Sequence, residues 1–138
     1  MAIRQLAHFA VRTRDLGVSR RFYEDVLQLR AGSRPPFAFP GAWLYVGGDE
    51  TALGVVHLVS GEASAAVGDY LGVPPTGASF GTGSLDHVAF FADDWPALRA
   101  RCDAAGATYV ERIVPGLGLL QVFLTDPSGV TLELTFAT

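Results

Sequence analysis

The sequence predicts an α+β fold in which one βαβββ unit occurs twice along the chain. Two observations predict this repeat. Segments with strand-like alternation, helical periodicity and then three further strand-like runs follow one another twice in the same order. Corresponding residues also keep one spacing, because 87 − 8 for His8 and His87 and 94 − 15 for Asp15 and Asp94 both give 79. A duplicated unit accounts for both observations.

The first unit begins with residues 3–12, in which apolar and polar side chains alternate as in a half-buried strand. Asp15 is a suitable N-cap for a helix that continues to about Leu29. The predicted buried face of this helix consists of Val18, Phe22, Val26 and Leu29. Three strands are then expected, over residues 32–37, 42–46 and 55–59.

The second unit begins with a strand over residues 85–92, and Asp94 is the expected N-cap of its helix. Gly106 is a typical helix stop. The sequence Asp126-Pro-Ser-Gly129 predicts a tight turn between the last two strands, since it has Pro at its second position and Gly at its fourth. The three expected strands cover residues 108–114, 119–124 and 130–136.

Length and composition indicate a single domain over residues 1–138. The chain is 49% hydrophobic and 17% charged, and it is long enough to bury a core. We expect the first module over about residues 1–60 and the second over about 84–138. Residues 61–83, which are rich in Gly, Ala and Ser, are expected to link them.

Charge and cysteine content exclude several classes of protein. A net charge of −4 without a Lys/Arg cluster argues against nucleic acid, whose phosphates require a basic surface. No apolar run approaches the roughly 20 residues that cross a bilayer, and the N-terminus lacks the features of a signal peptide. The lone Cys102 cannot form an internal disulfide, which favours a reducing compartment. We therefore expect a cytoplasmic protein that binds neither nucleic acid nor a membrane.

Strand parity places three candidate metal ligands on the faces of strands that do not pack against helices. His8, His87 and Glu133 each alternate with apolar neighbours, so they point away from the face that packs against helices. A buried glutamate is costly unless it is paired or binds a metal. Two histidines and one carboxylate suit non-haem Fe(II), and also Mn, Ni or Zn. The alternative, that these histidines are hydrogen-bonded core residues, remains open on the pattern alone.

Three segments carry a family resemblance: LAHFAVRTRDLGVSRRFYEDVLQL, LDHVAFFADD and FLTDPSGVTLEL. They resemble the vicinal oxygen chelate superfamily, which includes glyoxalase I, extradiol dioxygenases, thiol transferases and bleomycin-binding proteins. The resemblance implies two βαβββ modules that form an open, barrel-like sheet around a metal cup. It implies one divalent ion, Fe(II) first, held by His8, His87 and Glu133. Because the non-metal bleomycin-binding branch lacks these ligands, the resemblance favours an enzyme.

The sequence departs from glyoxalase I at the end of the first module. Glyoxalase I has a glutamate there that is both ligand and base, whereas this chain has His57. We interpret His57 as a fourth metal ligand or as an acid/base group, with Glu133 as the other catalytic residue. The alternative is a histidine in the wall of the cup that does not touch the metal.

Aromatic and polar side chains near these ligands are the candidate substrate-binding residues. Arg112 is included because an arginine can clamp a carboxylate or phosphonate. The candidates are Phe39, Trp43, Tyr45, Arg112, Gln121 and Phe123.

The predicted function is a metal-dependent enzyme whose small-molecule substrate chelates the ion through two neighbouring oxygens. Extradiol-type dioxygenation is the first hypothesis, because the triad leaves room for substrate and O₂ and the glyoxalase base is missing. The alternatives are a glyoxalase-like lyase, isomerase or epimerase, a thiol transferase, and a non-catalytic protein that binds a small molecule such as an antibiotic. A homodimer is expected, and the modules can pair within one chain or between two chains.

Overall fold

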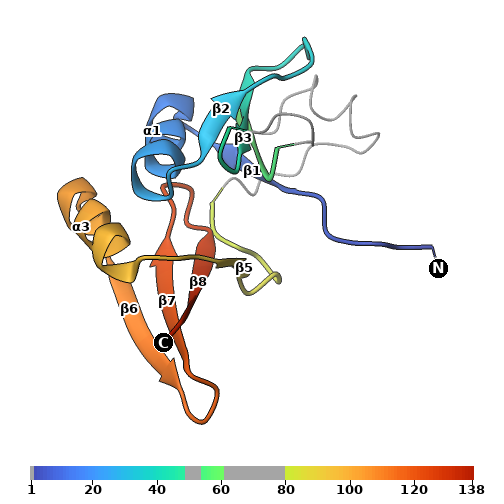
Figure 1. Cartoon of the computed structure of the whole chain (residues 1–138). Helices are drawn as coiled ribbons and strands as arrows, with labels where there is room; N and C mark the ends of the chain where they lie inside the picture. The colour runs from blue at the N-terminus through green and yellow to red at the C-terminus, as the bar shows by residue number, and fades with distance from the viewer. Residues whose placement is uncertain (1, 49–53, 61–79) are drawn as a thin grey trace.

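The computed structural model describes residues 2–48, 54–60 and 80–138, and its strands form two four-stranded sheets. Figure 1 shows β1–β3 in the upper part of the molecule and β5–β8 in the lower part, as two separate sheets that do not close into one barrel. The first sheet has the order β1-β4-β3-β2 and the second has the order β5-β8-β7-β6. The first sheet contains β1 (Phe9–Thr13), β2 (Arg30–Gly32), β3 (Gly41–Tyr45) and β4 (Val56–Ser60). The second contains β5 (Val88–Phe91), β6 (Tyr109–Val114), β7 (Leu119–Thr125) and β8 (Thr131–Ala137).

The two sheets repeat one register, which confirms the predicted pair of βαβββ modules. In each module the first strand pairs in parallel with the last. Ala10 lies opposite His57 in the first module, and Ala89 lies opposite Glu133 in the second. Ala10 and Ala89 are again 79 positions apart (89 − 10). His57 and Glu133 therefore occupy equivalent places in the repeat.

The first strand is shorter than the alternation predicts. Its hydrogen bonding begins where the N–H of Phe9 donates to Val55 O. Residues 2–7 are exposed and extend away from the body of the molecule (Figure 1). No strand among the described residues pairs with them, and alternation by itself cannot supply a partner. His8 and His87 accordingly lie immediately before β1 and β5 and not in the middle of strands.

The first helix differs from the uniform helix that the sequence predicts. It consists of α1 (Leu16–Arg21), capped by the Asp15 side chain, followed by the π-helix η1 (Phe22–Val26). The prediction for Val18 is wrong: it is exposed, and the buried face of the helix instead passes through Ser19, Phe22, Tyr23 and Val26. The helix ends before Leu29, whose N–H donates to Tyr23 O.

The second helix and the final turn agree with the sequence. Helix α3 (Trp95–Ala105) is capped by the Asp94 side chain and ends at Gly106, which has a positive φ. In the turn before β8, the N–H of Gly129 donates to Asp126 O. The linker predicted at residues 61–83 lies outside the described residues up to residue 79.

The loop after β2 replaces the predicted strand over residues 32–37. Pro35 and Pro36 have no N–H to donate to a sheet, so β2 ends at Gly32. The chain then forms a loop that carries Arg34, Phe37 and Phe39 to the start of β3.

The helices pack on one face of each sheet and leave the other face open. Arg101 of α3 donates from Nε to Val26 O of η1, which ties the two modules together. Among the described helices, none is both long and apolar enough to cross a bilayer. The core side chains on the helix-facing side of the sheets include Ala42, Leu44, Val56, Leu58, Val122, Leu124, Leu132 and Leu134.

A buried hydrogen bond joins the modules and provides a test of their packing. The Tyr23 hydroxyl donates to Asp126 Oδ2 at 2.6 Å, while Asp126 Oδ1 accepts from the N–H groups of Ser128 and Val130. Burial raises the pKa of Asp126, and these bonds oppose the shift. Stability from this group is therefore highest at low pH and falls as pH rises through the raised pKa, since the folded state binds the proton more tightly.

We expect Tyr23→Phe to lower the free energy of unfolding by about 1–3 kcal/mol at pH 7, because a buried carboxylate oxygen loses its partner. The loss should be smaller near pH 4, where protonation of Asp126 reduces the need for a donor. Urea unfolding at both pH values measures this. Tyr109→Phe is the matched control, because its hydroxyl bonds only Arg99 and Asp103 in exposed positions. An equal loss for both variants would contradict the assignment.

Candidate functional site

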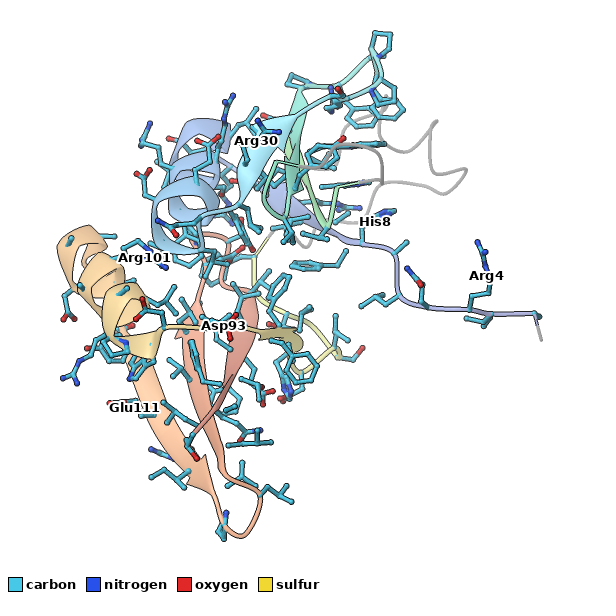
Figure 2. The ribbon with its side chains drawn as sticks, in the orientation of Figure 1. Arg4, His8, Arg30, Asp93, Arg101 and Glu111 are labelled. Atoms are coloured by element: carbon cyan, nitrogen blue, oxygen red, sulfur yellow. The ribbon has the colours of Figure 1, made fainter. Side chains whose placement is uncertain are left out.

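The first candidate cluster lies on the open face of the first sheet and is a stack of three rings. His57 of β4 lies between Trp43 of β3 and His8, which precedes β1. The ring centroids of His8 and His57 are 3.7 Å apart with planes at 16°, and those of Trp43 and His57 are 4.0 Å apart with planes at 8°. Nδ1 of His8 and Nε2 of His57 are both buried without a hydrogen-bond partner. Figure 2 shows His8 at the inner end of the N-terminal segment, from which Arg4 extends outward.

The environment of His57 favours the neutral imidazole. The side chain is only 8% exposed. Burial, followed by the nearby His8, lowers the pKa of His57 to about 4. An imidazole binds a metal through a ring nitrogen in its neutral form, and the ring of His57 has another ring stacked on each of its faces.

The second candidate cluster lies on the open face of the second sheet. Nε2 of His87 and Oε1 of Glu133 are 3.8 Å apart, too far for a hydrogen bond and near enough to share one ion. His87 Nδ1 lies 2.7 Å from Asp86 Oδ2. A carboxylate only accepts, so Nδ1 carries a proton, and in the neutral ring the lone pair is on Nε2, the nitrogen nearer Glu133. The bond to Asp86 also raises the pKa of His87.

Glu133 is held in a buried position by its neighbours in β8. It is 8% exposed, and Thr135 Oγ1 donates to its Oε2 at 3.1 Å. That bond leaves Oε1 toward His87. A carboxylate with one oxygen anchored and the other directed at a histidine is suited to bind a divalent cation.

The two clusters are equivalent in the repeat, yet they do not meet within one chain. His8 corresponds to His87, and His57 corresponds to Glu133. Across the described residues, no group of three or more His, Cys, Asp or Glu side chains is close enough to hold a metal ion. Each module therefore presents half of the donor set that the sequence predicts.

The predicted substrate-binding residues divide between the same two faces. Trp43 stacks on His57, and Phe123 makes an edge contact with His87 at 5.9 Å. Gln121 lies on the face of Glu133, because it pairs with Thr135 across β7 and β8. Phe39 stacks on Phe37 at 5.2 Å.

Two predicted residues have less direct access to these faces. Tyr45 is buried, and its hydroxyl donates to Ser33 O. Arg112 is exposed on β6, the last strand of its sheet, and donates to Glu111 O. The sequence reasoning did not select Asp86, Thr135 or Arg34. Asp86 directly precedes a candidate ligand, and Thr135 is two positions from another on the same strand face, so both had a usable sequence signal.

Two βαβββ modules, each with an open face opposite its helix-packed core, define the glyoxalase class of α+β folds. The chain belongs to the Glyoxalase/Bleomycin resistance protein/Dioxygenase superfamily, whose family model matches residues 5–134. This match confirms the resemblance to the vicinal oxygen chelate superfamily. A comparison with curated proteins returned no match.

Solved structures show the same fold at low sequence identity. The fosfomycin resistance protein FosX from Listeria monocytogenes is 16% identical, with a TM-score of 0.68 over 99% of this chain and 95% of that one. The lactoylglutathione lyase from Agrobacterium tumefaciens is 20% identical, with a TM-score of 0.65 over 99% and 96%. TnmS3, an antibiotic-binding protein from Streptomyces sp. CB03234, is 19% identical, with a TM-score of 0.64 over 100% and 99%. The superfamily thus contains enzymes and binding proteins.

Proposed function

We propose that this protein is a metal-dependent enzyme that acts on a small molecule with two neighbouring oxygen atoms. His8, His87 and Glu133 would hold one divalent ion. The observation that carries the proposal is the pair of Nε2 of His87 and Oε1 of Glu133, 3.8 Å apart on an open face and oriented by Asp86 and Thr135.

The candidate ligands fit such an ion as two half-sites, one with His8 and the other with His87 and Glu133. The buried Nδ1 of His8 lacks a partner in one half, and the His–Glu pair in the other half is not bridged by a hydrogen bond. Two imidazoles and one carboxylate suit Fe(II), and also Mn, Ni or Zn. When bound, the ion would supply Lewis-acid chemistry that holds the substrate and stabilises negative charge on its oxygens. The rings of Trp43 and Phe123 would position a planar substrate beside it.

We propose that two copies of the chain complete the site, with His8 from one copy and His87 and Glu133 from the other. The described residues of one chain bring no three ligands together. The outer edges of β1 and β5 are unpaired by any described strand, and Phe91 on the open face of β5 is 92% exposed. Unpaired edges and exposed aromatic side chains favour association.

The expected species in solution is therefore a homodimer with twice the chain mass of 14.6 kDa. Light scattering coupled to size exclusion, at micromolar concentration, measures it. A monomer over the whole concentration range would contradict both the dimer and the shared site.

Extradiol-type dioxygenation is the reaction that we propose first. Three protein ligands leave coordination positions for a substrate and O₂. The first module has His57 at the position where a glyoxalase would have its glutamate base. The test is metal analysis of protein purified without added metal, followed by screening of catechols with and without O₂. Stoichiometric iron with O₂-dependent ring cleavage is expected. Turnover that does not require O₂ would indicate a lyase or isomerase instead.

A non-catalytic binding protein is the second candidate. The stacked rings of Trp43, His57 and His8 favour it, because they form a wall of aromatic ring edges on the open face, against which an aromatic molecule can pack. The antibiotic-binding protein TnmS3 has the same fold. Purified protein that carries no metal and binds planar molecules without converting them would support this candidate against the enzyme.

Two substitutions distinguish whether His57 supports the ring of His8 or binds the ion itself. We propose that its ring supports His8 and does not bind the ion. His57→Ala is then expected to lower metal affinity by about tenfold, as for other groups that orient a ligand, whereas His57→Phe retains the stacking and most of the affinity. Competition with a fluorescent metal chelator measures both. If the Phe variant loses as much affinity as the Ala variant, the imidazole nitrogen itself is a ligand.

A further inference from the structure

Arg34 lies at the end of the ring stack, on the open face of the first sheet. Its guanidinium is 5.0 Å from the ring centroid of Phe37 and 5.3 Å from that of Phe39. Nη2 donates to Phe39 O at 2.7 Å. A Cβ added to Gly41 would lie 3.2 Å from Cζ of Arg34, so the side chain rests on the bare backbone of β3. Packing and one hydrogen bond thus hold the cation in one place.

This position belongs to the same wall as the first candidate cluster. Gly41 and Trp43 point to the same side of β3, because they are two positions apart in a strand. Trp43 stacks on His57, and its ring centroid is also 6.2 Å from that of Phe37. A small molecule packed along the ring edges of this wall, with one end near His8, would therefore have its other end toward Arg34.

The charge of Arg34 is not balanced within the described residues. Its Nε is buried and has no hydrogen-bond partner, and it forms no ion pair with a described carboxylate. Burial also lowers the pKa of its guanidinium. An unsatisfied buried donor on a charged group is costly. By contrast, Arg20 pairs with Glu24 on the exposed surface of α1.

We propose that Arg34 recognises a carboxylate on the small molecule that occupies this face. The ligand class is a planar, unsaturated or aromatic acid. A guanidinium matches the planar carboxylate group, and Nη2 is already partly used by Phe39 O, which leaves few donors for a larger anion such as a phosphate. The proposal rests on the proposed function only for the opposite, metal-chelating end of the ligand.

The experiment compares probes that differ only in charge. Benzoate and benzamide test the anion site without metal, and 3,4-dihydroxybenzoate and 3,4-dihydroxybenzamide test it on protein loaded with Zn(II), which cannot oxidise them. Quenching of tryptophan fluorescence measures affinity, because Trp43 lies on the wall. The variants are Arg34→Gln, Arg34→Lys and the exposed control Arg20→Gln, which removes the same charge from α1.

Wild-type protein is expected to prefer each acid over its amide by about tenfold to a hundredfold. Arg34→Gln should abolish the preference while amide affinity stays unchanged, Arg34→Lys should retain part of it, and Arg20→Gln should retain all of it. No preference in the wild-type protein, or no binding of either pair, overturns the proposal. Equal losses in Arg34→Gln and Arg20→Gln also overturn it. An Arg34-dependent preference for benzoate in protein that binds no metal supports this proposal while contradicting the proposed enzyme.

Discussion

Replacement of Glu133 by glutamine is expected to remove tight metal binding and to leave the fold intact. Glutamine keeps the shape of the side chain and removes the anionic oxygen that partly neutralises a divalent cation. Groups that merely orient a metal ligand are worth about 10–100-fold in affinity. The loss of a direct anionic ligand should therefore exceed about a hundredfold. The Thr135 hydroxyl can still donate to the amide oxygen, so the local packing of β8 is retained.

Without a bound metal, the Glu133→Gln variant is expected to be as stable as the wild-type protein or more stable. Glu133 is buried, and without an ion its charge lacks full compensation. Metal content and melting temperature, with and without Fe(II), Mn(II) and Zn(II), measure both effects. Glu111→Gln is the matched control, since Glu111 lies on the same sheet and is exposed. If Glu133→Gln binds metal as tightly as the wild-type protein, Glu133 is not a ligand. If the variant does not fold, the carboxylate has a structural role.

Mixing two defective chains is expected to restore metal binding. A His8→Ala homodimer and a Glu133→Gln homodimer each have a damaged ligand in every site. If His8 of one copy joins His87 and Glu133 of the other, a mixed dimer carries both defects in one site and leaves its second site intact. Metal binding should then return to about half of the wild-type amount in mixed dimers isolated with two different affinity tags.

The same mixture distinguishes the two ways in which the modules can pair. If the modules pair within a chain, every site in the mixed dimer keeps one defect and no metal binding returns. A mixture of His87→Ala and Glu133→Gln chains is the control. Both residues come from one module, 3.8 Å apart, so either arrangement leaves each site with one defect. Recovery in this control would contradict the assignment of the half-sites.

The sequence by itself determined the repeat, the faces of the last strand and the ends of the second helix. These features depend on local physics. The period of two in a strand places Glu133 opposite Leu132 and Leu134, and both leucines are buried against the helices as that parity requires. Asp94 and Gly106 bound their helix because capping needs only neighbouring residues. Strand parity also selected the candidate ligands His8, His87 and Glu133, the family resemblance supported them, and these three remain proposals.

Only the tertiary structure decided how distant residues meet. The π-helix that buries Tyr23 exists together with a hydrogen bond to Asp126, 103 positions away, which no local pattern encodes. Likewise, the stack of Trp43, His57 and His8 requires three segments to come together. The loop between β2 and β3, which contains Pro35 and Pro36, places Arg34 on the ring wall, whereas the sequence had favoured Arg112. Periodicity assigns a side chain to a face, but packing between segments decides which side chains on that face touch.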